Sequence, residues 1–70
     1  MDRQAVKSSR IKSVGWKSDI MEVEFMNGKL YCYFDVTINE FNSFMNAPSL
    51  GRAINTLEKH HKYVEMLNPY

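Results

Sequence analysis

The dipeptide Asn27-Gly28, which separates two apolar runs, constrains the fold more than any other feature of this 70-residue chain. In a type I′ hairpin loop both central residues take a positive φ, and asparagine and glycine do so at low cost. A two-residue loop also fixes the register of the two strands, so we expect Val23 to lie opposite Cys32. The residues expected on the core face of this hairpin are Met21, Val23, Phe25, Leu30, Cys32 and Phe34.

The same register predicts the residues on the other face of the hairpin. It pairs Glu22 with Tyr33 and Glu24 with Tyr31, and it turns all four side chains away from the core. A ligand that stacked on these tyrosines would therefore meet two carboxylates beside them.

Two further strand and helix signals flank this hairpin. Residues 11–16, IKSVGW, are typical of a first strand, which we expect to pair with the second through Val14 opposite Val23. After the third strand, Thr37 and Glu40 have the spacing of a capping box, which predicts the start of a helix. That helix is expected to end before Pro48, because proline disfavours helical geometry in the residue that precedes it.

A second helix is predicted to begin after Ser49, which can act as its N-cap. Its apolar residues recur with helical spacing at Leu50, Ala53, Ile54 and Leu57. The expected fold is therefore α+β, with a three-stranded antiparallel sheet followed by two helices packed on one face.

Length and composition indicate one domain. We expect a flexible basic N-terminal arm over residues 1–7, an α+β domain over 8–64 and a C-terminal tail over 65–70. The only cysteine, Cys32, excludes an internal disulfide, and no cysteine and histidine spacing predicts a metal site or a cofactor. No apolar run is long enough for a membrane span, so we expect a cytoplasmic protein with no membrane partner.

Charge is unevenly distributed along the chain. Residues 1–17 carry five basic residues and one acidic residue, whereas residues 18–40 carry one basic residue and five acidic residues. The basic segment can attract a polyanion, or it can neutralise the acidic hairpin. We favour neutralisation, because the net charge of the chain is only +1.

Three segments of this sequence resemble the KTSC domain, a small domain found at the C-terminus of some lysyl-tRNA synthetases and as single-domain bacterial and phage proteins. The segments are SSRIKSVGW at 8–16, VEFMNGKLYCY at 23–33, which contains the family's central Tyr-x-Tyr, and APSLGRAIN at 47–55. The resemblance implies no established activity, although RNA binding has been suggested for the family. The positions it marks are Tyr31 and Tyr33, together with Ser8, Ser9, Gly51 and Asn55, whose roles it leaves open.

Two kinds of binding partner fit these features. Single-stranded RNA can stack its bases on exposed aromatic side chains, here Tyr31 and Tyr33, while basic residues hold its phosphates. The candidate phosphate contacts are Lys7, Arg10, Lys12 and Lys17. A protein partner or a second copy of the chain is the alternative that we favour, since aromatic residues and methionine are enriched in protein interfaces. The candidates for that apolar surface are Met26, Tyr31, Tyr33, Tyr63, Met66 and Tyr70.

Catalysis is not expected from this sequence. Cys32 lies on the expected core face, where a buried thiol is usually inert. His60 and His61 are adjacent, so on a helix they point about 100° apart and do not share a face. We therefore expect a small non-enzymatic binding domain.

Overall fold

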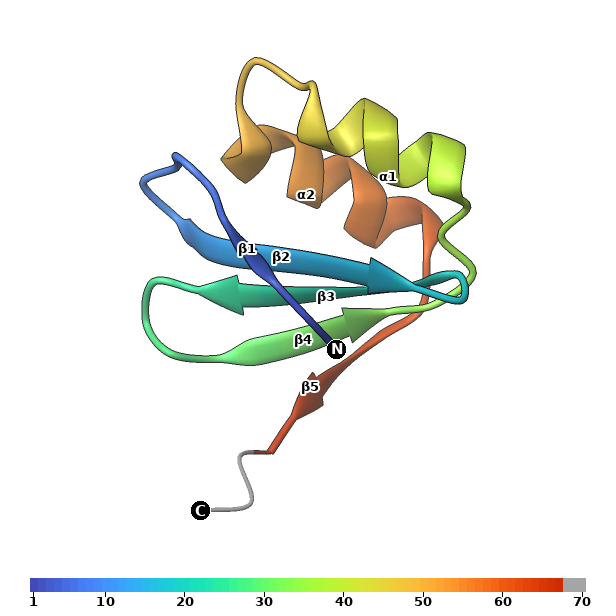
Figure 1. Cartoon of the computed structure of the whole chain (residues 1–70), viewed down its shortest axis with the longest axis horizontal. Helices are drawn as coiled ribbons and strands as arrows, with labels where there is room; N and C mark the ends of the chain where they lie inside the picture. The colour runs from blue at the N-terminus through green and yellow to red at the C-terminus, as the bar shows by residue number, and fades with distance from the viewer. Residues whose placement is uncertain (68–70) are drawn as a thin grey trace.

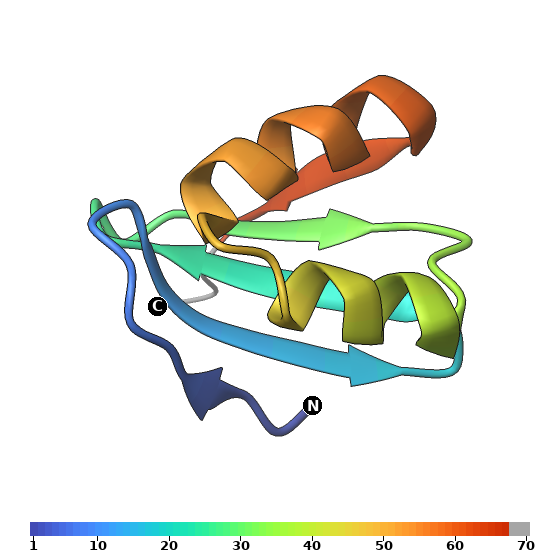
Figure 2. The same ribbon diagram turned by 90° about the horizontal axis from the view of Figure 1, so that it is seen from above.

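The chain forms a five-stranded antiparallel sheet with two helices packed on one of its faces (Figures 1 and 2). This computed structural model describes residues 1–67. Its elements are β1 (Gln4–Ala5), β2 (Ile11–Lys17), β3 (Ile20–Phe25), β4 (Leu30–Tyr33), α1 (Ile38–Met45), α2 (Leu50–His60) and β5 (Tyr63–Met66). The strands lie in sequence order from β1 to β5. Neither helix in the described residues is long and apolar enough to cross a bilayer.

The predicted α+β class is confirmed, as is the packing of both helices on one face. The sheet has five strands rather than three, because both ends of the chain join it. Gln4 and Ala5, from the expected N-terminal arm, pair with β2. Glu65 and Met66, from the expected C-terminal tail, belong to β5, which pairs with β4. Tyr70 lies outside the described residues.

The predicted register of the second hairpin is wrong by one residue. Met21 lies opposite Tyr33, Glu22 opposite Cys32 and Val23 opposite Tyr31. Tyr31 and Tyr33 therefore share the helix-facing side of the sheet with Val23. Of the six residues that we expected on the core face, the three from β3 are there, and the other three, Leu30, Cys32 and Phe34, are not.

The loop that sets this register contains three residues, 26–28. The Gly28 N–H donates to the carbonyl of Phe25 at 2.9 Å, and the Phe25 N–H donates to the carbonyl of Lys29 at 2.9 Å. Within the loop only Gly28 has a positive φ, at 90°. This is a type I turn followed by a glycine in the left-handed region, the commonest form of a three-residue hairpin loop. The Asn27 side chain supports it by accepting a hydrogen bond from the Lys29 N–H at 3.0 Å.

The first hairpin has the predicted pairing, with Val14 opposite Val23 and Trp16 opposite Met21. Its loop consists of Ser18 and Asp19, whose φ angles are 51° and 64°. Positive φ at both central residues is the type I′ geometry that we expected at Asn27-Gly28. The sequence contained no glycine at this position to mark the turn.

Both predicted helix starts are confirmed. The Thr37 side chain accepts from the Glu40 N–H, and the Glu40 carboxylate accepts from the Thr37 N–H, each at 3.1 Å. Ser49 accepts from the Arg52 N–H at 3.3 Å. The helices close a core over the sheet, which consists of Ile11, Val14, Met21, Val23, Tyr33, Val36, Phe44, Leu50, Ile54 and Leu57.

Candidate functional site

Tyr33 does not form part of a ligand-stacking surface, because its side chain is completely buried. Its hydroxyl donates a hydrogen bond to the Glu58 carboxylate on α2 at 2.8 Å. Burial raises the pKa of Tyr33, and the neighbouring Glu58 carboxylate raises it further, so the hydroxyl stays protonated. The prediction that this tyrosine faces away from the core is wrong.

Tyr31 is half-buried and belongs to a cluster of aromatic rings. Its ring centroid lies 5.3 Å from that of Phe25, 6.4 Å from that of Tyr33 and 5.8 Å from that of Tyr63. Phe25, Tyr31 and Tyr63 of this cluster line a cavity of about 290 Å³, which Arg10, Lys29 and Glu58 also line. The structure thus brings together two predicted site residues, Tyr31 and Arg10, which are far apart in the sequence.

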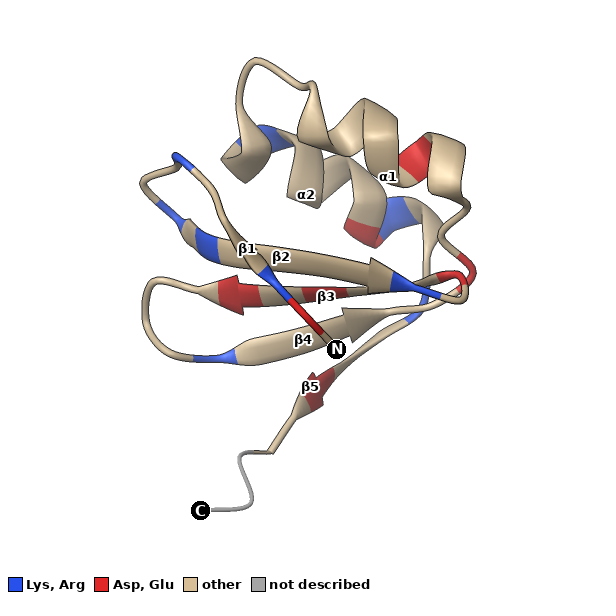
Figure 3. Ribbon diagram, in the orientation of Figure 1, with Lys and Arg blue, Asp and Glu red and all other residues tan. Residues whose placement is uncertain are grey.

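Glu22 and Glu24 lie on the outer face of the sheet, away from the tyrosines. Arg3 donates to the Glu22 carboxylate at 2.9 Å and to the Ser13 hydroxyl at 3.0 Å. Ser13 donates in turn to Glu24 at 2.9 Å. The neutralisation that we predicted between the basic and acidic segments is therefore observed at Arg3, just before the edge strand β1. Figure 3 shows the basic residues on β2 beside the acidic residues on β3.

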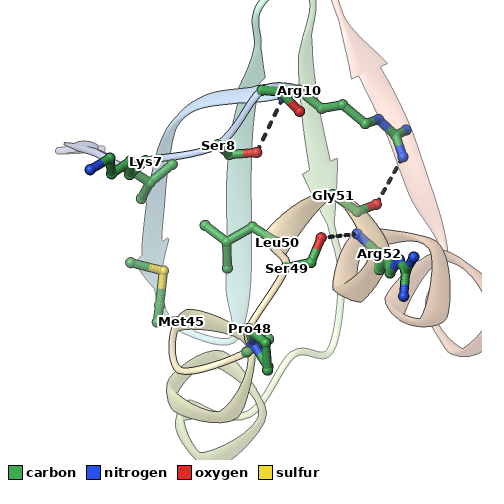
Figure 4. Close-up of a pocket in the computed structure, with 12 residues that line it drawn as sticks. Lys7, Ser8, Arg10, Met45, Pro48, Ser49, Leu50, Gly51 and Arg52 are labelled. Atoms are coloured by element: carbon green, nitrogen blue, oxygen red, sulfur yellow. Dashed lines mark hydrogen bonds between the residues drawn. The ribbon is translucent and has the colours of Figure 1, made fainter.

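The four basic residues predicted to contact phosphates do not gather at one site. Lys7 and Arg10 line a cavity of about 510 Å³ at one end of the molecule (Figure 4). Lys12 and Lys17 are exposed on β2 and do not line that cavity.

The same cavity brings together three of the four positions whose roles the family resemblance left open, Ser8, Ser9 and Gly51. The structure explains two of them. The Ser8 hydroxyl accepts from the N–H groups of Arg10 and Ile11, each at 3.2 Å, and so holds the turn before β2. Gly51 allows Arg10 to lie close to α2, since a Cβ at this position would lie 3.1 Å from the Arg10 Cδ.

The family resemblance marked Asn55, which lies outside this cavity, and did not mark Arg52, which lines it. Asn55 is exposed on α2 and lies outside the cavity. Arg52 lines the cavity, and sequence reasoning missed it. Its position directly after Gly51, in the first turn of a capped helix, was the signal available.

The outer face of β4 and β5 carries an apolar patch, formed by Leu30, Cys32, Val64 and Met66. Val64 is 51% exposed and Met66 is 40% exposed. Cys32 faces outward, which corrects the prediction of a core thiol, and its Sγ lies 3.1 Å from the Met66 Sδ. Burial raises the pKa of Cys32 and the Glu22 charge raises it further, so the thiol is a poor nucleophile.

His61 links three elements of the fold. Its Nε2 lies 2.7 Å from the Glu40 carboxylate on α1, and its Nδ1 lies 2.9 Å from the carbonyl of Phe34, which follows β4. Since both ring nitrogens have an acceptor as their neighbour, the ring fastens α1 and the end of β4 to the end of α2. His61, one of the two histidines of the chain, thus has a structural role.

Comparison with known proteins places this arrangement in a family. The sequence model of the KTSC domain matches residues 7–63. An uncharacterized protein of Stutzerimonas stutzeri (strain A1501) is 39% identical over 67 residues, which cover 90% of this chain and 94% of that protein. The crystal structure of a KTSC domain protein from Yersinia pestis is similar with a TM-score of 0.84 and 31% identity, over 94% of this chain and 97% of its own.

Proposed function

The chain belongs to the KTSC domain family, and we propose that it is a non-enzymatic protein-binding module that adds an extended segment of its partner to the sheet beside β5. The observation that carries the proposal is the open edge of β5, a strand whose four residues are all exposed. Exposed strand edges pair readily with another chain, and several peptide-binding domains use them in this way.

The backbone of β5 supports this proposal. The Phe34 N–H donates to the carbonyl of Lys62 at 2.9 Å, just before β5 begins. Hydrogen-bonded pairs alternate along an antiparallel ladder, so the backbone groups of Val64 and Met66 point toward β4. Those of Tyr63 and Glu65 point away from the sheet, where an added strand can bond to them.

The side chains of β5 indicate what kind of segment fits. Val64 and Met66 continue the apolar patch on the outer face, while Tyr63 is 42% exposed on the face that carries the helices. Successive side chains of an added strand would alternate between these two faces. We therefore expect a partner segment with apolar residues at every second position, next to the patch.

Two expectations from the sequence are also part of the proposal: that the domain is not an enzyme, and that it is a cytoplasmic protein of a bacterium or a phage. The raised pKa of the Cys32 thiol and its neighbour Met66, which is not a base, favour a domain without enzymatic activity. Both relatives come from bacteria. A cytoplasmic protein of a bacterium or a phage is the setting that we propose.

A proline substitution in β5 tests the proposal. Glu65→Pro removes an N–H that points away from the sheet and leaves the β4–β5 hydrogen bonds in place. Glu65→Ala is the matched control, because it removes the same charge and keeps the N–H. The wild-type protein and both variants serve as baits in lysate of the source cell, and the captured material is scored for protein and for nucleic acid.

We expect specific protein partners to bind the wild type and Glu65→Ala and to be lost with Glu65→Pro. Recovery of the same partners on Glu65→Pro would contradict binding at the β5 edge. A second copy of the chain is the other occupant to test. Sedimentation of the purified protein at increasing concentration identifies it, since a dimer through β5 is also lost with Glu65→Pro.

Binding of single-stranded RNA is a second candidate, and one observation favours it. The hairpin register leaves Glu22 and Glu24 on the opposite face from Tyr31. Two cations, Arg10 and Lys29, line the same cavity as its ring, with Glu58 as the one carboxylate that the described residues place there. One base stacking on Tyr31 and a phosphate at Arg10 would fit this arrangement. Titration with single-stranded RNA at two salt concentrations tests it: Tyr31→Ala would abolish a specific complex, and an unchanged affinity would exclude this site.

A further inference from the structure

The cavity of about 510 Å³ at the end of the molecule plays no part in the proposed strand addition. Three segments that are separate in the sequence line it: the turn before β2, the connection between the helices and the first turn of α2 (Figure 4). Its volume lies within the range of small-molecule pockets, about 300–1,000 Å³.

Three cations line this cavity, and no acidic residue does. Lys7 and Arg10 come from the turn before β2, and Arg52 comes from α2. Within residues 1–67, none of the three has a carboxylate within ion-pairing distance. The Arg10 guanidinium is held in position, because its Nη1 donates to the carbonyl of Gly51 at 2.8 Å. Arg10 and Arg52 lie on the same side of the cavity, whereas the Lys7 side chain points away on the opposite side (Figure 4). The two arginines thus bring positive charge to the start of α2 that no carboxylate of the described residues pairs with.

Hydroxyl groups add donors that an anion can use. The Ser8 Oγ accepts from two backbone N–H groups, and the Ser49 Oγ accepts from the Arg52 N–H. A hydroxyl that accepts in this way still has its own O–H to donate. No hydrogen bond from either O–H occurs in the part of the chain that the structure describes. Both hydroxyls belong to residues that line the cavity.

The remaining lining is apolar. It is contributed by Val6, Met45, Ala47, Pro48 and Leu50. A bare inorganic ion would leave this surface uncovered, whereas an organic group attached to the anion can pack against it.

We propose that this cavity binds a small organic phosphate monoester, with its phosphate at Arg10 and Arg52 and its carbon skeleton on the apolar wall. A phosphate monoester carries close to two negative charges at neutral pH and three oxygens that accept hydrogen bonds. Two guanidinium groups and two hydroxyl donors match that charge and that number of acceptors better than they match a carboxylate.

The test is a titration of the ¹⁵N-labelled protein followed by amide chemical shifts. The probes are phenyl phosphate, inorganic phosphate and benzyl alcohol, which separate the phosphate group from the organic group. We expect phenyl phosphate to cause saturable shifts at residues 8–10 and 50–52. Inorganic phosphate should bind there more weakly, and benzyl alcohol should cause no shift.

Two variants locate the charge that matters. Arg52→Gln removes an exposed cation of the cavity and should raise the Kd for phenyl phosphate about tenfold or more. Lys59→Gln removes a cation near the other end of the same helix, outside the cavity, and should change the Kd less than about twofold.

Three results would overturn the proposal. The first is the absence of saturable shifts in the cavity with phenyl phosphate. The second is an equal loss of affinity in Lys59→Gln and Arg52→Gln, which would indicate general attraction of anions. The third is equal affinity for inorganic phosphate and phenyl phosphate, which would show that the organic group contributes nothing to binding.

Discussion

Tyr33 joins β4 to α2 through a hydrogen bond of 2.8 Å from its hydroxyl to the Glu58 carboxylate. The ring is fully buried among core residues, and its hydroxyl reaches the half-buried Glu58 at the margin of the core. The second tyrosine of the Tyr-x-Tyr segment therefore fixes how the helices lie on the sheet. Tyr31 is the more exposed of the two.

The first prediction concerns this bond. Tyr33→Phe should lower the free energy of unfolding by about 1 kcal/mol, because it removes one hydrogen bond and keeps the ring. Tyr33→Ala should cost about 3–5 kcal/mol, because it empties the core. Urea denaturation measures both. Tyr63→Ala is the control for an exposed tyrosine on the neighbouring strand, and a loss equal to that of Tyr33→Ala would contradict the burial of Tyr33.

The second prediction distinguishes the two hairpin registers. In the three-residue loop only Gly28 has a positive φ, so Gly28→Ala should cost about 1–2 kcal/mol. Asn27→Ala should cost less, about 0.5–1 kcal/mol, because it removes only the hydrogen bond to the Lys29 N–H. A type I′ loop needs positive φ at both residues. A cost at Asn27 as large as that at Gly28 in thermal denaturation would therefore favour the two-residue loop expected from the sequence, with Val23 opposite Cys32.

The third prediction concerns acid stability. The Thr37 N–H, and after it His61, hold the pKa of Glu40 below its usual value of 4.5. The ionised carboxylate therefore stabilises the fold above pH 4.5, and this contribution is lost as the pH falls through the lowered pKa. Glu40→Gln keeps a side-chain oxygen for the cap but cannot ionise.

Urea denaturation between about pH 5 and pH 3 checks this prediction. The free energy of unfolding of the wild type should fall more steeply toward low pH than that of Glu40→Gln. Parallel pH profiles for the two proteins would show that Glu40 does not stabilise the fold through its charge.

The fourth prediction concerns Gly15, whose outer surface is covered by the N-terminal segment. A Cβ at this position would lie 2.5 Å from the carbonyl oxygen of Asp2. Gly15→Ala should therefore displace residues 1–3 from the sheet and break the Arg3–Glu22 pair, while the core stays folded. The expected cost is about 1 kcal/mol or less, since a chain end can move aside.

The heteronuclear NOE of the Arg3 amide measures that displacement, and it should fall in Gly15→Ala. Arg3→Gln serves as the comparison, because it removes the ion pair without adding a Cβ. An ordered Arg3 amide in Gly15→Ala would show that the segment does not need the glycine.

Local signals predicted the helices well, because a cap is set by neighbouring residues. Thr37, Glu40 and Ser49 act as their spacing indicated. The hairpin register was not decided locally, since Asn27-Gly28 suits a two-residue loop and also a three-residue loop with glycine last. In the strand that follows, both alternating sets of side chains are apolar or aromatic: Leu30 and Cys32 on one face, Tyr31 and Tyr33 on the other. Either set is therefore able to face the core. Packing under the helices selects the tyrosines.

The edge strand and the cavity depend on contacts between distant parts of the chain. Residues 63–66 form a short exposed strand only because they pair with β4. Their own sequence carries no clear strand signal, which is why we expected residues 65 and 66 in a C-terminal tail. The cavity combines residues 6–10 with residues 45–52. The family resemblance marked three of its positions but gave no reason to connect them, and Arg52 became visible only in the folded chain.

Amide hydrogen exchange along β5, with and without a captured partner, tests the central claim most directly. In the isolated chain the amides of Tyr63 and Glu65 should exchange rapidly, while those of Val64 and Met66 are protected by β4. In the complex, exchange at Tyr63 and Glu65 should slow at least about tenfold, with little change at the other two. Slowed exchange elsewhere, with Tyr63 and Glu65 still rapid, would contradict strand addition at β5.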